Sequence, residues 1–192
     1  QRTVSTVTLS AVVAIAAVLV VQADRNGPQG VWIGAWPEPL GIALVADRLS
    51  ALMLLVSALV TLAVLVYSMG QGMTADAESA PLSVYHPSFL VLAAGVANAF
   101  LAGDLFNLFV SFEILLFASY VLLTIGGTES RVRAGTIYVV VNVVSSMLFL
   151  VAIAAVYAAT GSLNLAQLAG RIGDLPPSVA LLLQLMLLTT FG

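Results

Sequence analysis

Long apolar runs, separated by short polar segments, account for most of the chain. A helix needs about 20 residues to cross the hydrocarbon core of a bilayer, and five of the runs reach roughly that length. They predict membrane-spanning helices at 4–22, 47–69, 84–102, 105–124 and 134–159. A sixth run starts near residue 178 and continues to residue 192. At 1.5 Å per residue it covers only about 20 Å, so we expect it to be part of a span.

The segments between the runs predict two local structures. Gly103-Asp104 is the only interruption between the third and fourth spans. These spans therefore form a tight helical hairpin, with Asp104 as the N-cap of the second helix. Nearer the N-terminus, apolar stretches on both sides of residues 37–39 allow a short β-hairpin over 31–46. Two tryptophans in this segment are typical of the boundary between lipid and water, which places the hairpin at the membrane surface.

Composition supports a membrane protein and excludes several other classes. Of the 192 residues, 61% are hydrophobic and 8% are charged, against about 25% charged residues in soluble domains. So few charges exclude a soluble enzyme and a nucleic-acid binder, and the absence of cysteine excludes disulfides and thiolate metal sites. The single histidine, His86, stands before a proline at a helix entrance and is expected at the interface. We therefore expect an all-α, polytopic transmembrane bundle in contact with the lipid bilayer, with no metal, no cofactor and no nucleic-acid partner.

The ends of the chain and its arginines bear on topology. Because residue 1 is glutamine and the chain stops inside its sixth apolar run, we expect residues 1–192 to be part of one longer integral-membrane domain. The six arginines divide three against three between the two sides, so the positive-inside rule does not decide the orientation. The close pair Arg131 and Arg133 favours the cytoplasmic side for the loop between the fourth and fifth spans.

One acidic residue lies deep in a predicted span. Glu113 is nine residues from Asp104, which puts it about 14 Å into the membrane, near the midplane. An ionised acid at this depth costs roughly 3 kcal/mol, so it serves either as a structural bond to another helix or in moving protons. The aromatic residues on its helix face destabilise the carboxylate, and we expect proton exchange near neutral pH. We interpret Glu113 as a proton relay.

Hydroxyl and amide side chains near this depth are candidates for a proton path. Two of them, Tyr120 and Thr124, continue the Glu113 face further along the same helix. Four polar residues share one face of the fifth span, at spacings of three and four: Tyr138, Asn142, Ser145 and Ser146. Both groups fit a wet path and also fit ordinary packing between membrane helices.

The residues around Glu113 resemble a known family signature. The run GDLFNLFVSFEILLFASYVLL at 103–123 is similar to that of the antiporter-like membrane subunits. These subunits occur in Mrp-type (multiple resistance and pH) cation/proton antiporters, respiratory complex I and membrane-bound hydrogenases. In its specific form the run is most similar to the D-type subunits of Mrp antiporters. Three further segments match as well: ADRLSA at 46–51, NVVSSMLF at 142–149 and TGSLNLA at 160–166.

The resemblance implies a fold of fourteen transmembrane helices built from two inverted five-helix repeats, each with a broken helix. The chain would supply the second to sixth helices and the start of the seventh, with the first helix and the C-terminal half absent. Glu113 corresponds to the family's glutamate on the fifth helix. In the family that glutamate pairs with a lysine on the seventh helix, which would lie beyond Gly192.

The resemblance also implies a function. The chain would be the ion-translocating subunit of a multi-subunit antiporter in a bacterial cell membrane, a secondary active transporter and not an enzyme. Its partners would be other membrane subunits, and H⁺ and Na⁺ the transported ions. The alternative is a proton-pumping subunit of a complex I-like NADH:quinone oxidoreductase or a hydrogenase, with redox centres in other subunits. A third hypothesis is a scaffold in which Glu113 only locks helices together.

Overall fold

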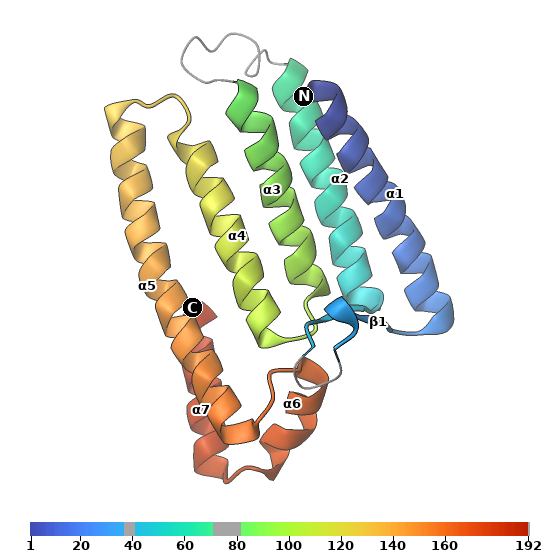
Figure 1. Cartoon of the computed structure of the whole chain (residues 1–192), viewed down its shortest axis with the longest axis vertical. Helices are drawn as coiled ribbons and strands as arrows, with labels where there is room; N and C mark the ends of the chain where they lie inside the picture. The colour runs from blue at the N-terminus through green and yellow to red at the C-terminus, as the bar shows by residue number, and fades with distance from the viewer. Residues whose placement is uncertain (37–40, 71–81, 192) are drawn as a thin grey trace.

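The computed structural model of the chain describes residues 1–36, 41–70 and 82–191. Five long helices stand side by side in sequence order and run alternately up and down (Figure 1). They are α1 (Arg2–Asn26), α2 (Arg48–Gly70), α3 (Leu82–Leu101), α4 (Leu105–Thr124) and α5 (Glu129–Thr160). All five are long and apolar enough to cross a membrane, which confirms the predicted polytopic helical bundle.

Most of the long helices extend beyond the apolar runs that predict them. Only α4 has the predicted bounds, whereas α1 has 25 residues and α5 has 32. The added turns carry polar residues such as Arg25 and Glu129. Hydropathy detects the part of a helix suited to hydrocarbon, so it misses turns that continue into the polar zone.

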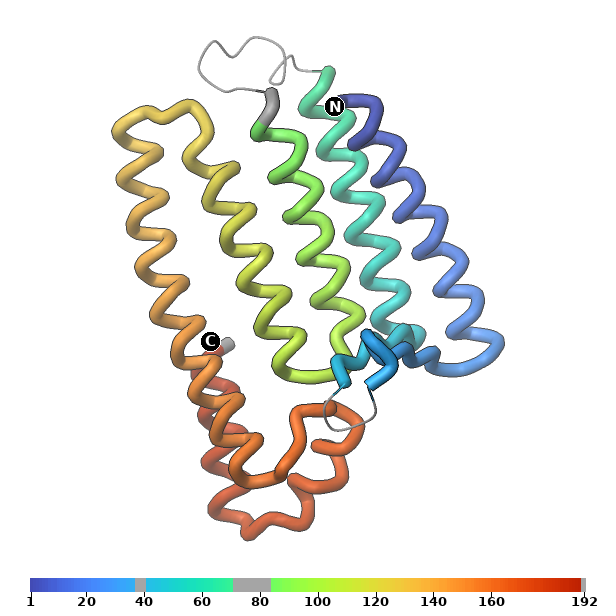
Figure 2. The backbone as a smooth tube through the Cα atoms, in the orientation of Figure 1, coloured from blue at the N-terminus to red at the C-terminus, as the bar shows by residue number. Residues whose placement is uncertain are grey.

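Below α5 the chain reverses through two short helical segments. These are α6 (Leu165–Arg171) and a 3₁₀ turn (Ile172–Asp174), and they lead into α7 (Pro177–Phe191). Figure 2 shows α7 rising beside the lower half of α5 and ending at mid-height. Apolar side chains from α4 to α7 form one buried cluster: Leu105, Phe149, Ile153, Val156, Leu168 and Leu183. This cluster fixes the middle of α7 against α5.

A small antiparallel hairpin connects α1 to α2. Its strands are β1 (Gln29–Trp32) and β2 (Ala43–Ala46), with Trp32 opposite Ala43. The predicted hairpin is therefore confirmed, although its first strand starts before residue 31 and is followed by a 3₁₀ turn at Ile33–Ala35. The predicted turn at Pro37-Glu38-Pro39 lies outside the described residues.

The turn between α3 and α4 is bonded to two distant segments. Gly103 N–H donates to the Ala43 carbonyl of β2 at 2.8 Å, and the Gly103 carbonyl accepts from Leu165 N–H at 3.0 Å. Leu105 N–H donates to the Leu163 carbonyl at 3.0 Å. A Cβ on Gly103 would lie 3.0 Å from the Ala43 carbonyl oxygen, so only glycine permits this approach.

Asp104 uses both carboxylate oxygens at this junction. Oδ1 accepts from Asn107 N–H at 2.7 Å, which confirms the predicted N-cap of α4. Oδ2 accepts from Ala43 N–H at 3.2 Å. The residue is 6% exposed, so a single buried carboxylate starts α4 and holds the β-hairpin against it.

Helices α3 and α4 pack through a close glycine contact and a polar cluster. A Cβ on Gly95 would lie 3.1 Å from the backbone nitrogen of Leu115, so the two backbones are nearly in contact. One turn further along α3, Asn98 Nδ2 donates to Asn107 Oδ1 at 3.1 Å and to Ser111 Oγ at 2.8 Å. These bonds fix the face that α4 turns toward α3.

His86, near the start of α3, is buried within the bundle. It is 1% exposed, and its ring contacts the ring of Tyr85 edge-on, with centroids 5.4 Å apart. A neighbouring cluster of Leu9, Leu65 and Phe89 joins α1, α2 and α3. The expected interfacial depth of His86 stays a prediction, and the structure adds that other helices of the bundle cover the residue.

We expect Asp104→Ala to lower the free energy of unfolding by about 2 kcal/mol, since it removes an N-cap and one acceptor of the hairpin. The measurement is thermal unfolding of the full-length protein in detergent, followed by the loss of helical circular dichroism. Asp104→Asn retains one side-chain oxygen and is expected to lie between Asp104→Ala and the wild type.

The matched control is Asp24→Ala. Asp24 pairs with Arg48 at 3.1 Å, but both side chains are mostly exposed, so its loss should change stability little. Equal melting temperatures for Asp104→Ala and Asp24→Ala would show that the junction does not hold the bundle together.

Candidate functional site

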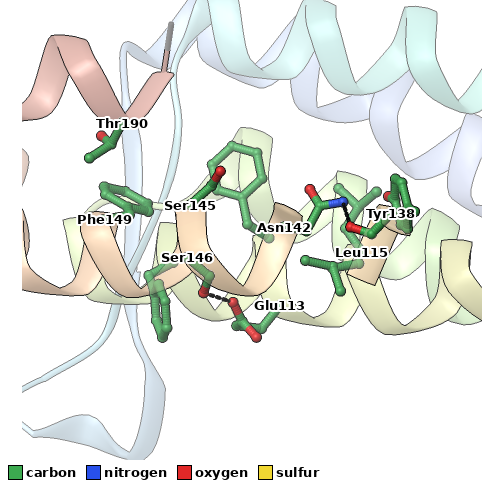
Figure 3. Close-up of a pocket in the computed structure, with 11 residues that line it drawn as sticks. Glu113, Leu115, Tyr138, Asn142, Ser145, Ser146, Phe149 and Thr190 are labelled. Carbon is green, nitrogen blue, oxygen red and sulfur yellow. Dashed lines mark hydrogen bonds between the residues drawn. The ribbon is translucent and has the colours of Figure 1, made fainter. Parts of the chain in front are cut away.

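A cavity lies between α4 and α5, beside the end of α7 (Figure 3). Its volume is about 220 Å³, enough for several water molecules. Polar side chains and large apolar ones both line it: Phe109, Phe112, Glu113, Leu115, Leu116, Tyr138, Asn142, Ser145, Ser146, Phe149 and Thr190. The antiparallel packing of two adjacent helices thus brings the midplane acid of α4 to the polar face of α5.

Glu113 is held by a side chain of the neighbouring helix. The hydroxyl of Ser146 donates to Glu113 Oε1, as the dashed line in Figure 3 shows. Glu113 itself is half-buried. Among the described residues the only ion pair is Asp24–Arg48, so within this part of the chain the carboxylate has a hydroxyl donor and no cationic partner.

The polar face of α5 continues from Ser146 toward the loop at 125–128. Asn142 Nδ2 donates to the Tyr138 carbonyl at 2.7 Å, and Ser145 Oγ donates to the Val141 carbonyl at 3.1 Å. The Tyr138 hydroxyl is 2.8 Å from Ser119 Oγ on α4. Tyr138, Asn142, Ser145 and Ser146 therefore all lie on the cavity, as the spacing on α5 predicts.

Aromatic rings close the opposite end of the cavity. The Phe149 ring meets the rings of Phe109 and Phe112 edge-on, with centroids 6.1 Å and 6.2 Å apart. Phe149 is buried and also belongs to the apolar cluster below the cavity. These rings make this wall of the cavity mostly apolar, and Thr190 of α7 adds a hydroxyl group there.

Two predicted path residues lie away from the cavity. Tyr120 and Thr124 pack against Gly135 of α5, where an added Cβ would lie 2.5 Å from Thr124 Cγ2 and 3.1 Å from Tyr120 Cε2. The Thr124 hydroxyl donates to the Tyr120 carbonyl of its own helix at 2.9 Å. The helical period places these residues on the same face of α4 as Glu113. The period of one helix does not show where α5 packs closely against it, so it cannot separate these residues from the cavity.

Ser119 and Thr190 are site residues that the sequence patterns do not single out. Ser119 contacts the site through Tyr138, and Thr190 reaches the cavity from α7. A serine six residues after the acid has no signal of its own. The position of α7 depends on the reversal through residues 161–176, which periodicity does not describe.

Two family models match the sequence. Residues 102–192 match the family described as "NADH:quinone oxidoreductase/Mrp antiporter, TM". Residues 32–71 match the family described as "NADH-Ubiquinone oxidoreductase (complex I), chain 5 N-terminus". The first model includes the whole Glu113 cavity, and the second includes most of the hairpin and α2.

Curated relatives are D-type antiporter subunits of bacteria. The chain is 39% identical over 175 residues to the D subunit of a Na⁺/H⁺ antiporter of Alkalihalophilus pseudofirmus, covering 91% of this chain and 35% of the relative. It is 48% identical over 145 residues to the D subunit of a probable K⁺/H⁺ antiporter of Rhizobium meliloti, covering 76% of this chain and 26% of the relative. It is 39% identical over 174 residues to the D subunit of a Na⁺/H⁺ antiporter of Bacillus subtilis, covering 91% of this chain and 34% of the relative. The chain thus spans about a third or less of the length of these relatives.

Solved structures show the same fold. A chain of the Mrp complex from Dietzia sp. DQ12-45-1b matches with a TM-score of 0.85 at 29% identity, over 98% of this chain and 34% of that chain. A chain of an archaeal membrane-bound sulfane sulfur reductase matches with a TM-score of 0.87 at 29% identity, over 98% of this chain and 38% of that chain. On sequence and fold together, the chain belongs to the antiporter-like membrane subunits and is of the D type found in Mrp antiporters.

Proposed function

We propose that the protein containing this chain is the ion-translocating subunit of a multi-subunit cation/proton antiporter, with Glu113 as its proton relay. One observation carries the proposal: a half-buried carboxylate, near the centre of α4, faces a cavity that is polar on one side. A carboxyl group inside a membrane bundle is retained for ion or proton pathways. The D-type relatives are named as antiporter subunits, which supports antiport as the process that Glu113 serves.

The contact with Ser146 suits both protonation states of Glu113. The Ser146 hydroxyl donates to the ionised carboxylate. When Glu113 takes up a proton, its own O–H becomes a donor and the serine oxygen can accept. Water in the cavity supplies or removes the proton, and a cation that approaches Glu113 favours the ionised form. Proton movement and cation movement are thereby coupled through one group.

We infer that the exported cation is Na⁺, the ion for which two of the relatives are named. The Rhizobium relative is named for K⁺ and has the higher identity, so K⁺ is the second candidate. The cavity offers hydroxyl, amide and carboxylate oxygens, which suit either of these hard cations.

We further propose that the chain works with other membrane subunits in a bacterial plasma membrane, as a secondary active transporter. The named relatives are subunits, and one structural match is part of an Mrp complex. A redox pump is the second candidate function, because the sulfane sulfur reductase chain has the same fold. Antiport is favoured by the relatives with 39% to 48% identity, which are antiporter subunits.

The direct test replaces Glu113 in the full-length protein within its assembly. Inside-out vesicles are energised by respiration, a cation is added, and a pH dye reports proton efflux. We expect Glu113→Gln to abolish the response, because an amide cannot exchange a proton, and Glu113→Asp to retain part of it. Co-purification of the partner subunits checks that the assembly is intact.

Ser10→Ala on the outer face of α1 is the matched control and should transport like the wild type. If Glu113→Gln transports normally and only the melting temperature of the bundle falls, Glu113 is a scaffold residue and the relay proposal is wrong.

The cation is tested in the same vesicles by titrating NaCl and KCl separately. We expect Na⁺ to give the half-maximal response at the lower concentration. A response to K⁺ at lower concentrations would transfer the assignment to K⁺. If neither cation gives a response in wild-type vesicles, the redox-pump candidate replaces antiport.

A further inference from the structure

We propose that His86 is a second proton-binding site of the protein, and that a proton bound there opens the packing of α1 against α3. The inference goes beyond the proposed transport function, because this proton is not transported but changes how helices pack. It starts from one observation: His86 is 1% exposed, yet neither ring nitrogen has a hydrogen-bond partner. Buried polar groups in proteins are almost always paired, so this ring calls for a physical explanation.

His86 belongs to a buried polar layer at one end of α1, α2 and α3. These three helices are joined by an apolar cluster of Leu9, Leu65 and Phe89. One helical turn from each cluster member, toward the end of the bundle where α1 and α3 begin (Figure 1), are Ser5, Ser68 and His86. They are 1%, 3% and 1% exposed. The ring is therefore enclosed by three helices and has hydrocarbon on its inner side.

The polar layer suits a neutral ring and does not suit a charged one. A neutral imidazole carries one N–H, whereas a protonated imidazole carries two and a positive charge. No described residue places an acceptor within hydrogen-bond distance of the His86 ring. The nearby Ser68 hydroxyl already accepts from the Tyr85 hydroxyl at 3.2 Å and donates to the Leu65 carbonyl at 2.8 Å. Burial of an unpaired charge is far more costly than burial of an unpaired neutral group, so protonation favours a ring that has left the layer.

The charged and titratable groups around the ring supply no negative partner. On α1 the positive charge of Arg2 acts on His86, as does the amino group with which the described chain begins. The other helices packed at this end contribute only tyrosines: Tyr67, Tyr85 and Tyr120. Within the described parts of α1 to α4, no carboxylate lies at this end. A protonated ring would therefore meet like charge on α1, which adds to the tendency of the two helices to separate.

The start of α3 is built to move. Pro87 follows His86 directly and has no N–H, so the first turn of α3 lacks one helical hydrogen bond. When this turn moves away from α1, the ring reaches water, where an imidazole takes up a proton near pH 6.5. The proton binds a ring nitrogen of the open form and has to leave before the ring packs again. Opening therefore increases as the pH falls below about 6.5 and is suppressed above it.

The position of His86 suggests what this opening regulates. By the charge of Arg131 and Arg133, this end of the bundle is expected to face the cytoplasm. An antiporter that brings protons into the cell would then be slowed when the cytoplasm becomes acidic, because α1 and α3 lose their packing. This consequence rests on the proposed function, whereas the opening itself does not.

The opening is tested by thiol labelling of the full-length protein within its assembly, in detergent. This chain has no cysteine, and any cysteine elsewhere in the assembly is replaced by serine. Ser5→Cys reports on the buried face of α1, and Thr3→Cys, at an exposed position of the same end, corrects for the pH dependence of the reagent. Between about pH 7.5 and about pH 5.5, the Ser5→Cys rate relative to Thr3→Cys should rise about tenfold. With His86→Phe or His86→Gln the ratio should stay constant, since neither side chain binds a proton in this range.

The proton site is refuted if the ratio does not rise with His86 present, or rises equally in both His86 variants. It is also refuted if both variants label rapidly at every pH, which indicates a packing residue. Antiport in the vesicles described above tests the regulation. On acidification of the bath, which is the cytoplasmic side, the wild type should lose activity that His86→Phe keeps, and an equal loss refutes the regulation.

The relay is tested separately in the same series. Glu113→Gln should show the same labelling response to pH as the wild type, because the opening at His86 does not depend on the acid of α4. Normal transport by Glu113→Gln would refute the proposed function of Glu113 and leave the labelling result of His86 unaffected.

Discussion

The whole arrangement depends on the hydrogen bonds around Gly103 and Asp104. A backbone group that leaves helical structure in or near a membrane has to find its partner within the protein. Here the break between α3 and α4 is satisfied by β2 on one side and by the segment before α6 on the other. Three parts of the chain that are far apart in sequence are consequently fixed to one point. The α3–α4 hairpin, the β-hairpin and the reversal that positions α7 are therefore held together.

The same junction determines which way α4 faces. Ser111 and Glu113 are two residues apart and so point to nearly opposite sides of the helix. The bond from Asn98 holds Ser111 toward α3, and Glu113 is consequently turned toward α5 and Ser146. A polar cluster that never touches the cavity thus positions the carboxylate within it, because a helix side chain cannot turn without its neighbours.

Sequence alone is sufficient where a feature depends on one helix or on local chemistry. The five spans, the Asp104 cap and the shared face of Tyr138, Asn142, Ser145 and Ser146 follow from hydropathy, turn residues and helical period. Sequence alone is insufficient where the position of a residue depends on how two helices pack together. Tyr120 and Thr124 share the face of Glu113 but pack on Gly135, and Ser119 joins the site only through a residue of α5. His86 likewise stands at the end of its own helix yet is covered by others.

The length of α5 has a consequence for the lipid around the protein. Its 32 residues measure about 48 Å, well beyond the roughly 30 Å of a hydrocarbon core, so α5 either tilts or stands out into the headgroups. Ser146 is close to the middle of this helix, and a rod that tilts about its centre moves its ends far more than its midpoint. The depth of the carboxylate is therefore insensitive to bilayer thickness, while the distance from the bilayer surface to the loop at 125–128 changes with it. Membranes of different thickness would leave the acid in place and alter only its access.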